Sequence, residues 1–346
     1  MVVVRYDFCR LITAQYAILN FIFNTFGVSQ FQQSSFLMTK TVDIFTIANA
    51  LLDSEFTVSA EFIQAQQLTK GIAHLVDTAA HQTLSEQLGE PKLVAAGGAC
   101  ANSIYAAASL GGKCAITGRV GEDQAGAQLL ASLAKANIIL SEPKLWKAPG
   151  STGQCFVLLT DDADRTMVTH LGVSSQIEVE NIDLDLLRKS RYLLIEGYQC
   201  SSSQANASSN TAIKAARQAD VNIAVSVCDE FIAEQCREQF LAMLGQESVD
   251  IIFCNQFEAM KLTEQPTVSQ AIDKLLVMAK RCVVTQGAQG AMIATANDRA
   301  QISAPKVTAI DTLGAGDQFV GTCLFALNQG LNLAAAAQFA VKTCAE

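Results

Sequence analysis

Short apolar runs alternate with longer helix-like stretches over most of the chain from residue 41 onwards. Parallel strands need long crossover connections, and a parallel sheet must be covered by helices on both faces. This alternation therefore predicts an α/β fold built on a central, mostly parallel sheet. The runs that we expect to form its strands are 43–50, 114–121, 191–197, 221–227, 250–254 and 281–287.

Two stretches between these runs have a clear helical pattern. In the segment 268–280, apolar residues at 268, 271, 272, 275, 276 and 279 share one helical face. Thr267 precedes this segment and Gln270 follows three residues later, which is a capping-box pattern. The segment 122–137 is also amphipathic. Both are typical of helices that cover a parallel sheet.

Four short segments fit the doubly wound pattern poorly. The runs 153–160 and 165–172 alternate in hydrophobicity around the acidic turn 161–164 and predict a β-hairpin. The runs 54–59 and 92–98 are short and extended-looking. We expect these segments to form a small separate β-sheet.

The charge balance limits the classes of partner. Lys and Arg total 24 against 33 Asp and Glu, so the formal net charge is −9. Binding to a nucleic-acid backbone needs a basic face, so we expect no nucleic-acid partner. A small anionic ligand stays compatible, because it needs only local donors and a few cations.

The eleven cysteines indicate a reducing compartment. None has CxxC spacing and their number is odd, which favours reduced, buried thiols over a disulfide framework. The histidines at 74, 81 and 170 form no metal-binding pattern, so a structural zinc site is not expected. We expect a cytoplasmic protein with no stable membrane partner.

Residues 1–40 differ from the rest and are treated as an N-terminal extension of open status. The apolar run 11–23 is shorter than the ~20 residues of a membrane span. No small-x-small cleavage site of a signal peptide follows it. Because the regular pattern begins only after Met38, an extension or a misassigned start codon is the favoured interpretation, and a membrane anchor is the alternative.

The segment DTLGAGDQFVG (311–321) places three glycines where an apolar helix is about to begin. Gly314, Ala315 and Gly316 would lie at the helix entrance, where backbone N–H groups lack intrahelical partners and can bind an anion. Asp317 would then stand where it can take a proton from a hydroxyl held beside a phosphate. Alone, the segment favours a simpler interpretation, a turn whose carboxylate complements the helix dipole.

Three further segments carry polar residues beside predicted strands. In NQFE, Asn255 and Glu258 follow a strand and could hold a hydrated magnesium ion, with a helix cap as the alternative. TQGAQGA (285–291) ends another strand, with a tight turn as the alternative. GGACAN (97–102) precedes a helix-like alanine run. Asp53 ends the first strand region, where an ordinary loop aspartate is the alternative.

In this order the segments resemble the motifs of the ribokinase-like (PfkB) family of carbohydrate and nucleoside kinases. Residues 97–126 are similar to the family's N-terminal signature and DTLGAGD to its C-terminal one, while NQFE and TQGAQGA match its N-x-x-E element and nucleotide loop. The resemblance implies a ribokinase-like α/β domain over 41–346, with a central, mostly parallel sheet flanked by helices. A small β-sheet lid would be formed by about 53–60, 92–98 and 153–172.

The resemblance also implies a role for each matching residue. Asp317 is the expected general base for the acceptor hydroxyl, beside an anion hole for the transferring phosphoryl group. Phosphoryl transfer needs positioning and charge stabilisation more than covalent help, so such groups suffice. The implied anion-hole residues are Gly314, Ala315 and Gly316; those for ATP and Mg²⁺ are Asn255, Glu258 (to the metal through water), Thr285, Gly287 and Gly290; those for substrate hydroxyls are Asp53, Gly97, Gly98 and Asn102.

Some implied features rest on single positions. Asp311 shapes the loop or a nearby monovalent-cation site, so K⁺ is an additional candidate cofactor. Arg165, in the lid hairpin, could contact the substrate or be an ordinary solvated arginine. Position 318 is Gln, where the family commonly has a small or apolar residue. The family resemblance also allows a homodimer through the lid.

These features together predict ATP-dependent phosphorylation of the primary hydroxyl of a ribose-containing small molecule, a nucleoside such as adenosine ahead of a free sugar of the ribose or fructose type. A non-catalytic nucleotide- or sugar-binding protein is a different class, and it would be favoured by loss of the base, yet Asp317 is present. A dinucleotide-dependent oxidoreductase would need GxGxxG after the first strand, where ANALLD stands, and no P-loop motif occurs.

Overall fold

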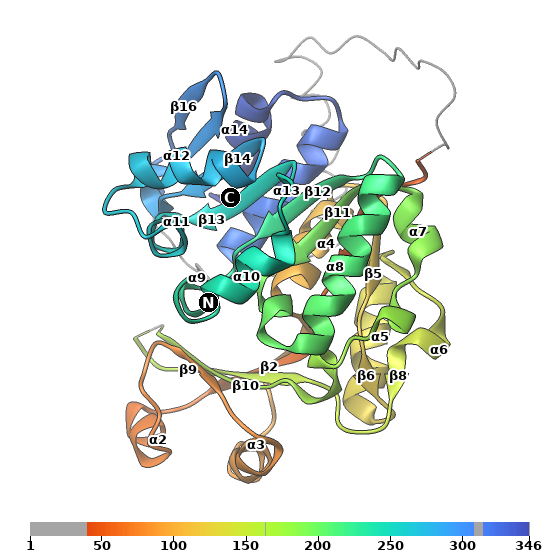
Figure 1. Cartoon of the computed structure of the whole chain (residues 1–346). Coiled ribbons are helices and arrows are strands. Elements are labelled where there is room, and N and C mark those ends of the chain that lie inside the picture. Colours follow the sequence, from red (N-terminus) through yellow and green to blue (C-terminus); the bar gives the residue numbers. More distant parts are fainter. Residues whose placement is uncertain (1–39, 163, 308–313, 346) are drawn as a thin grey trace.

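A nine-stranded sheet forms the centre of the computed structural model, which describes residues 40–162, 164–307 and 314–345 (Figure 1). Neighbouring strands are parallel from β7 to β14, and β15 and β16 add an antiparallel edge. The prediction of a mostly parallel central sheet is confirmed. In spatial order the strands are β16 (Arg299–Ile302), β15 (Ala291–Thr295), β14 (Arg281–Thr285), β13 (Ile251–Asn255), β12 (Asn222–Ser226), β11 (Ser190–Glu196), β1 (Val42–Ile47), β5 (Cys114–Thr117) and β7 (Ile139–Leu140).

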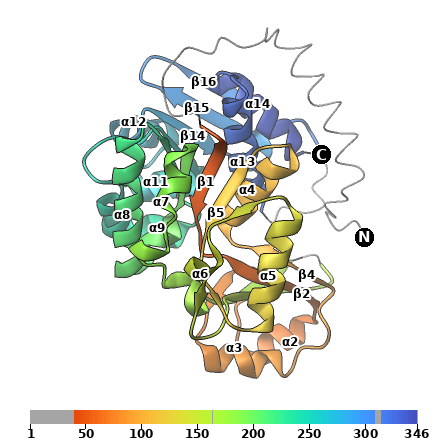
Figure 2. The ribbon, with the colours of Figure 1, turned by 90° about the vertical axis from the view of Figure 1, so that its right-hand side faces the viewer.

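Helices cover both faces of this sheet (Figure 2). Alternate side chains of a strand point to opposite faces, so Leu193 and Ile195 of β11 join one buried cluster while Tyr192 and Leu194 join the other. One face is covered by α4 (Ala99–Ser109), α5 (Gln124–Lys135), α13 (Ala315–Asn328) and α14 (Leu333–Thr343); the other by α7 (Leu184–Arg188), α8 (Ser203–Gln218), α9 (Glu230–Gln235), α10 (Arg237–Leu244), α11 (Gln256–Thr263) and α12 (Val268–Met278).

A separate five-stranded sheet lies beside the carboxyl ends of the central strands (Figure 1). Its spatial order is β3 (Ala73–Leu75), β10 (Arg165–His170), β9 (Gln154–Leu159), β2 (Leu51–Thr57) and β4 (Leu93–Gly97). Strands β9 and β10 form the predicted antiparallel hairpin. Helices α2 (Ala60–Ala65) and α3 (Thr78–Ser85) cover its outer face around Phe56, Phe156 and Leu158, and leave the other face turned toward the main body. The small separate sheet expected from the sequence is therefore present.

The sequence prediction was wrong about where two elements begin and end. The apolar run 43–50 was expected to be one strand, but β1 ends at Ile47 and the chain enters the small sheet at Leu51. Asp53 therefore lies inside β2 and not at the end of the first strand. The run 114–121 is also divided, into β5 and a short β6 (Val120–Gly121). Strand β6 pairs with β8 (Lys147–Ala148), which directly follows α6 (Pro143–Trp146) in the sequence.

Local capping explains where several helices start. Thr267 is the N-cap of α12, and its hydroxyl oxygen accepts from the N–H of Gln270 at 3.4 Å. The predicted capping box is only half formed, because the Gln270 side chain accepts from the Thr267 hydroxyl instead of reaching the backbone. In the described part of the chain, no helix has the length and apolar character needed to span a membrane. The predicted extension, residues 1–40, lies almost entirely outside the described residues.

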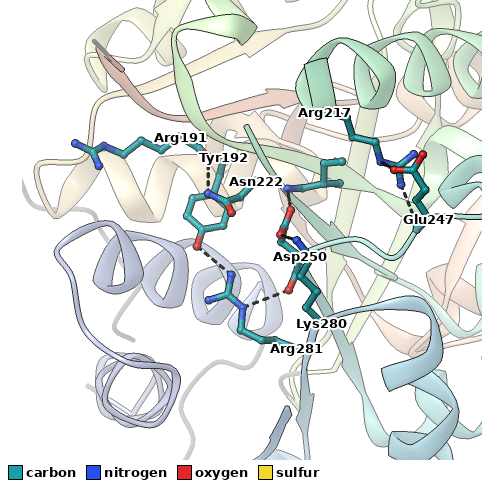
Figure 3. Close-up of polar contacts among 9 residues, drawn as sticks. Arg191, Tyr192, Arg217, Asn222, Glu247, Asp250, Lys280 and Arg281 are labelled. Atoms are coloured by element: carbon teal, nitrogen blue, oxygen red, sulfur yellow. Dashed lines mark hydrogen bonds and ion pairs between the residues drawn. The ribbon is translucent and has the colours of Figure 1, made fainter. Parts of the chain in front are cut away.

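Hydrogen bonds and ion pairs link the residues at the amino ends of the central strands (Figure 3). The Asp250 carboxylate accepts from the N–H of Ile223 at 2.7 Å and pairs with Lys280 at 2.7 Å. The Arg281 guanidinium donates to the hydroxyl of Tyr192 at 3.4 Å. None of the residues predicted to act on a ligand lies in this group.

Candidate active site

The entrance of helix α13 is open and lacks a side-chain cap. Its N-cap, Gly314, has a left-handed φ of 69°, a conformation that glycine adopts without steric cost. Apart from chain neighbours and the helix's own backbone, no atom of the described residues lies within 4 Å of where a Cβ at Gly314 or Gly316 would stand. The helix start therefore has no side-chain cap on its first N–H groups, which is the condition for an anion site at a helix N-terminus.

Asp317 lies in the first turn of α13 and accepts a hydrogen bond from Asn102 of α4, with Nδ2 and Oδ2 3.1 Å apart. The two helices approach closely, since a Cβ at Gly321 would stand 1.8 Å from the carbonyl oxygen of Ser103. Burial raises the pKa of Asp317 to about 8, and the negative charges of Glu196, Asp53 and Glu258 add to this rise. The hydrogen bond from Asn102 acts in the opposite direction.

Asp53 lies against the turn that leads into α4. A Cβ at Gly97 would stand 2.0 Å from Asp53 Oδ2, so a larger residue there would displace this carboxyl group. Gly98 has a φ of 101°, and a Cβ there would stand 2.3 Å from the carbonyl oxygen of Asn49. Burial raises the pKa of Asp53 to about 7. The structure thus places Asp53 and the two glycines at the turn before α4, and Asn102 in the first turn of that helix.

Asn255 and Glu258 form a reciprocal capping box at the start of α11. The Asn255 side-chain oxygen accepts from the N–H of Phe257 and of Glu258 at 2.8 and 2.9 Å. In return, Glu258 accepts from the Asn255 N–H at 2.9 Å and from its Nδ2 at 2.7 Å. Burial raises the pKa of Glu258 to about 7. The alternative considered from the sequence, a helix cap, is therefore present, and it fixes the carboxyl group at the carboxyl edge of the sheet.

The Thr285 loop lies beside this cap. Thr285 ends β14 directly opposite Asn255 of β13, and it pairs on its other side with Ala291 of β15. The loop is also the tight turn considered from the sequence, because the N–H of Gln286 donates to the carbonyl oxygen of Gly290 at 2.7 Å. Gly287 and Gly290 both have positive φ, and the space around Gly287 is open. The turn therefore presents an accessible backbone next to Glu258.

One predicted residue of the described chain, Arg165, is not brought into this group. Asp53 is in register with Cys155, and Cys155 with Thr169. Arg165 is four residues from Thr169 along β10, so its backbone lies about 13 Å from that row at 3.3 Å per residue. It occupies the same face of the small sheet as Asp53, farther out beside the hairpin turn. Asp311, the candidate cation residue, lies outside the described residues.

Glu196 is a buried site residue that sequence reasoning missed. It is the last residue of β11, has no exposed surface and lies close enough to act on the pKa of Asp317. The signal was a single carboxylate at the end of the apolar run YLLIE, where parallel sheets place ligand-binding groups. Gln318, the departure from the family pattern, donates from Nε2 to the carbonyl oxygen of Thr343 at 3.1 Å and so joins α13 to α14.

Comparison with known proteins gives consistent matches. The sequence profile of the pfkB family of carbohydrate kinases matches residues 77–346. A probable chloroplastic fructokinase-6 of Arabidopsis thaliana is 30% identical over 69% of this chain, and the match spans 64% of that protein's own length. Among solved structures, a probable sugar kinase from Rhizobium etli superposes with a TM-score of 0.82 at 26% identity, covering 89% of this chain and 93% of that one. An adenosine kinase from Sinorhizobium meliloti gives a TM-score of 0.80 at 26% identity, covering 86% and 91%.

Proposed function

The chain belongs to the pfkB family of carbohydrate kinases, enzymes that phosphorylate a hydroxyl group of a small molecule, and from this premise we propose that it transfers phosphate from ATP to the primary hydroxyl of a ribose-containing substrate. The single observation that carries the proposal is the position of Asp317. Its carboxylate lies at the open N-terminus of α13, held by Asn102, with the first-turn backbone N–H groups beside it.

Asp317 acts as the general base in this proposal. Its carboxylate accepts the proton of the acceptor hydroxyl, and a base whose pKa lies near neutrality is well matched to that task. The N–H groups at Gly314, Ala315 and Gly316 face the charge on the transferring phosphoryl group. Asp53, Gly97 and Gly98 orient the acceptor from the turn before α4. Arg165 remains a candidate contact from the lid.

The residues present fit ATP and magnesium. When bound, MgATP would supply the phosphoryl group, and its magnesium ion would offset part of the negative charge on the phosphate oxygens. Asn255 and Glu258 would hold the metal and a phosphate oxygen, while Thr285, Gly287 and Gly290 offer the backbone to the nucleotide. Within the described residues, no group of three or more His, Cys, Asp or Glu forms a metal cage. Magnesium needs no such cage, because it keeps several waters and takes few protein ligands. A monovalent cation at Asp311 stays a further proposal.

The small sheet acts as a lid in this account, formed by about 53–60, 92–98 and 153–172 of a kinase domain over 41–346. Its inner face, free of α2 and α3, carries the apolar side chains of Leu51, Cys155, Val157 and Met167. Closure of such a face over the acceptor would exclude water and so prevent hydrolysis of ATP.

A nucleoside is the favoured acceptor because an apolar lid face suits a planar base better than a free sugar, whose carbons nearly all carry hydroxyls. Phe231, at the start of α9, is 57% exposed and follows Asp229, whose charge acts on Glu258. Because α9 contacts α11, which carries Glu258, this exposed ring is a candidate aromatic surface for the base. The match to a solved adenosine kinase supports the same choice. A free-sugar kinase is the alternative, supported by the fructokinase relative.

The proposed assembly is a homodimer through the lid. Its two outer strands expose large apolar side chains, with Leu75 on β3 70% exposed and Leu93 on β4 42% exposed. An exposed apolar sheet edge is a ready template for pairing with a second chain. Analytical ultracentrifugation should show a dimer that the change Leu93→Lys weakens, and a wild-type monomer at all concentrations contradicts it.

The proposed location is the cytoplasm. All ten cysteines in the described part of the chain are free, which is typical of a reducing compartment. Fractionation of cells that express full-length and Met38-start forms tests this together with the extension. Equal distribution of the two forms removes the membrane-anchor alternative, and enrichment of only the full-length form with membranes supports it.

An acceptor panel tests the proposed function. Adenosine, ribose and fructose are incubated with the protein, ATP and magnesium, and phosphorylated products are identified by mass spectrometry. The proposal expects adenosine 5′-phosphate as the fastest product. Faster phosphorylation of fructose or ribose supports the free-sugar alternative. If no acceptor is phosphorylated while ATP still binds, the protein is a non-catalytic binding protein.

A further inference from the structure

Glu196 is a fully buried carboxylate that accepts three hydrogen bonds. Its Oε1 accepts from the N–H of Asn49 at 2.7 Å and from Nε2 of Gln199 at 3.2 Å. Its Oε2 accepts from the N–H of Cys100 at 3.1 Å. Burial raises the pKa of Glu196, and these three hydrogen bonds act in the opposite direction, because a buried carboxylate needs such partners to offset its lost hydration. Glu196 thereby joins the ends of β11 and β1 to the beginning of α4.

Helix α4 has no cap of its own. Its N-cap is Gly98, whose lack of a side chain leaves the first N–H groups of the helix without a local acceptor. Cys100 is the second residue of α4. Its N–H donates to Glu196, which lies at the end of strand β11, 96 positions later in the sequence. The carboxylate therefore does for α4 what a serine or aspartate N-cap does locally. Its negative charge also suits the positive end of the helix dipole.

The first turn of α4 determines where Asn102 meets the proposed base. Asn102 follows two residues after Cys100, and its N–H donates to the carbonyl oxygen of Gly98 at 2.8 Å. Its Nδ2 donates to Asp317 at 3.1 Å. A displacement of the capped turn would therefore displace the side chain that orients Asp317.

We propose that Glu196 is a positioning residue: it caps α4 from strand β11 and so holds Asn102 against Asp317. Glu196 has no exposed surface, so it acts through α4 and not by touching the substrate or ATP. The inference rests on the proposed function, in which Asp317 is the base. Its consequence is that a change at Glu196 lowers the rate of the chemical step while leaving ATP binding intact.

The change Glu196→Gln tests this with little change in side-chain volume. One oxygen is retained, but the new amide NH₂ faces a backbone N–H of Asn49 or Cys100. We expect kcat to fall roughly 10–100-fold, because small displacements at a reacting centre have effects of this size. The KM for ATP should stay unchanged, since Asn255 and Thr285 lie on β13 and β14.

Thr46→Val is the matched control. Thr46 is fully buried, and its hydroxyl donates to the carbonyl oxygen of Leu194 at 2.8 Å. Its hydroxyl therefore bridges β1 and β11, the two strands that Glu196 joins, and within the described residues it makes no hydrogen bond to α4. We expect this variant to lose thermal stability but to keep kcat within about twofold, because only stability and not the site is altered. Equal losses of kcat in both variants would overturn the positioning role.

A double-mutant cycle and hydrogen exchange complete the test. If Glu196 acts through Asn102, adding Glu196→Gln to Asn102→Ala should lower kcat by less than about twofold further, and additive losses would contradict the coupling. Amide exchange over residues 99–102 should speed up in Glu196→Gln and not in Thr46→Val. The exchange measurement needs no activity, so it tests the cap even if the wild type phosphorylates nothing, and unchanged exchange overturns the proposal.

Discussion

Asn102 donates a hydrogen bond from Nδ2 to Oδ2 of Asp317, 3.1 Å away, across 215 positions of sequence. The bond joins the first turns of α4 and α13, two helices that pack side by side on one face of the central sheet. Each of these helices begins at a glycine without a side-chain cap. The predicted substrate turn and the predicted anion hole thus meet at a single pair of side chains.

This bond predicts how activity depends on pH. Below its pKa of about 8, Asp317 is protonated and cannot accept the hydroxyl proton, so kcat/KM should fall as the pH decreases through this range. Asn102 stabilises the charged form, so Asn102→Ala raises the pKa of Asp317 and should move this fall to higher pH. The measurement is kcat/KM between about pH 5 and 9 for both proteins.

The control for this prediction is Asn210→Ala in α8, where the side chain bonds only within its own helix, to Asn206. Its pH profile should coincide with that of the wild type. A profile of Asn102→Ala that coincides with the wild type, or moves to lower pH, contradicts the role given to the bond.

Gly98→Ala should damage both the fold and the acceptor site. The added Cβ would stand 2.3 Å from a backbone oxygen, at a φ of 101° that other residues rarely adopt. We expect a loss of about 1–3 kcal/mol in the free energy of unfolding and a higher KM for the acceptor. Urea denaturation and steady-state kinetics measure the two effects.

Gly89→Ala is the comparison for this change, because no atom of the described residues beyond its chain neighbours lies within 4 Å of the Cβ it would add. Its free energy of unfolding should stay within about 0.5 kcal/mol of the wild type. If both variants are equally stable, the close approach at Gly98 does not constrain the turn.

Glu258→Gln separates the proposed metal role of this residue from its observed capping role. The amide can keep part of the capping box but lacks the negative charge that attracts a hydrated cation. We expect the magnesium concentration for half-maximal activity to rise roughly tenfold or more. Activity is measured against magnesium at saturating ATP.

Thr267→Ala is the matched control for Glu258→Gln, because it also weakens the N-terminal cap of a helix. Thr267 caps α12, and its hydroxyl bonds to Gln270 of the same helix. This variant should lose about 1 kcal/mol of stability with its magnesium dependence unchanged. An unchanged magnesium requirement in Glu258→Gln would leave that residue a helix cap only.

Much of the fold could be predicted because strand–helix alternation and the parallel sheet have the same physical cause. The burial of both sheet faces makes each strand, such as β11 or β13, a short continuous apolar run. The same property hid the boundary between β1 and β2. The chain stays apolar from Phe45 to Leu52 with hardly a break, so nothing in the local pattern marks the passage from one sheet to the other.

The site was predictable where its residues lie close together in motifs and was missed where they act alone. Asp53, Asn102 and Asp317 could be named because glycines or neighbouring polar residues marked their segments. Glu196 could not be named, since its partners Asn49 and Cys100 are 147 and 96 positions away in the sequence and only the fold brings them to it. Arg165 is the opposite case: its position in the hairpin could be predicted from the sequence, but its distance from the row of Asp53 could not.

Asp317→Asn tests the central claim most directly. The amide keeps the size of the side chain but cannot accept the hydroxyl proton, while the residues proposed to hold ATP lie on β13, β14 and their loops. With the best acceptor of the panel, kcat should fall roughly 10²–10⁴-fold with ATP affinity and thermal stability near those of the wild type. Turnover by Asp317→Asn at the wild-type rate would contradict the assignment of Asp317 as the base.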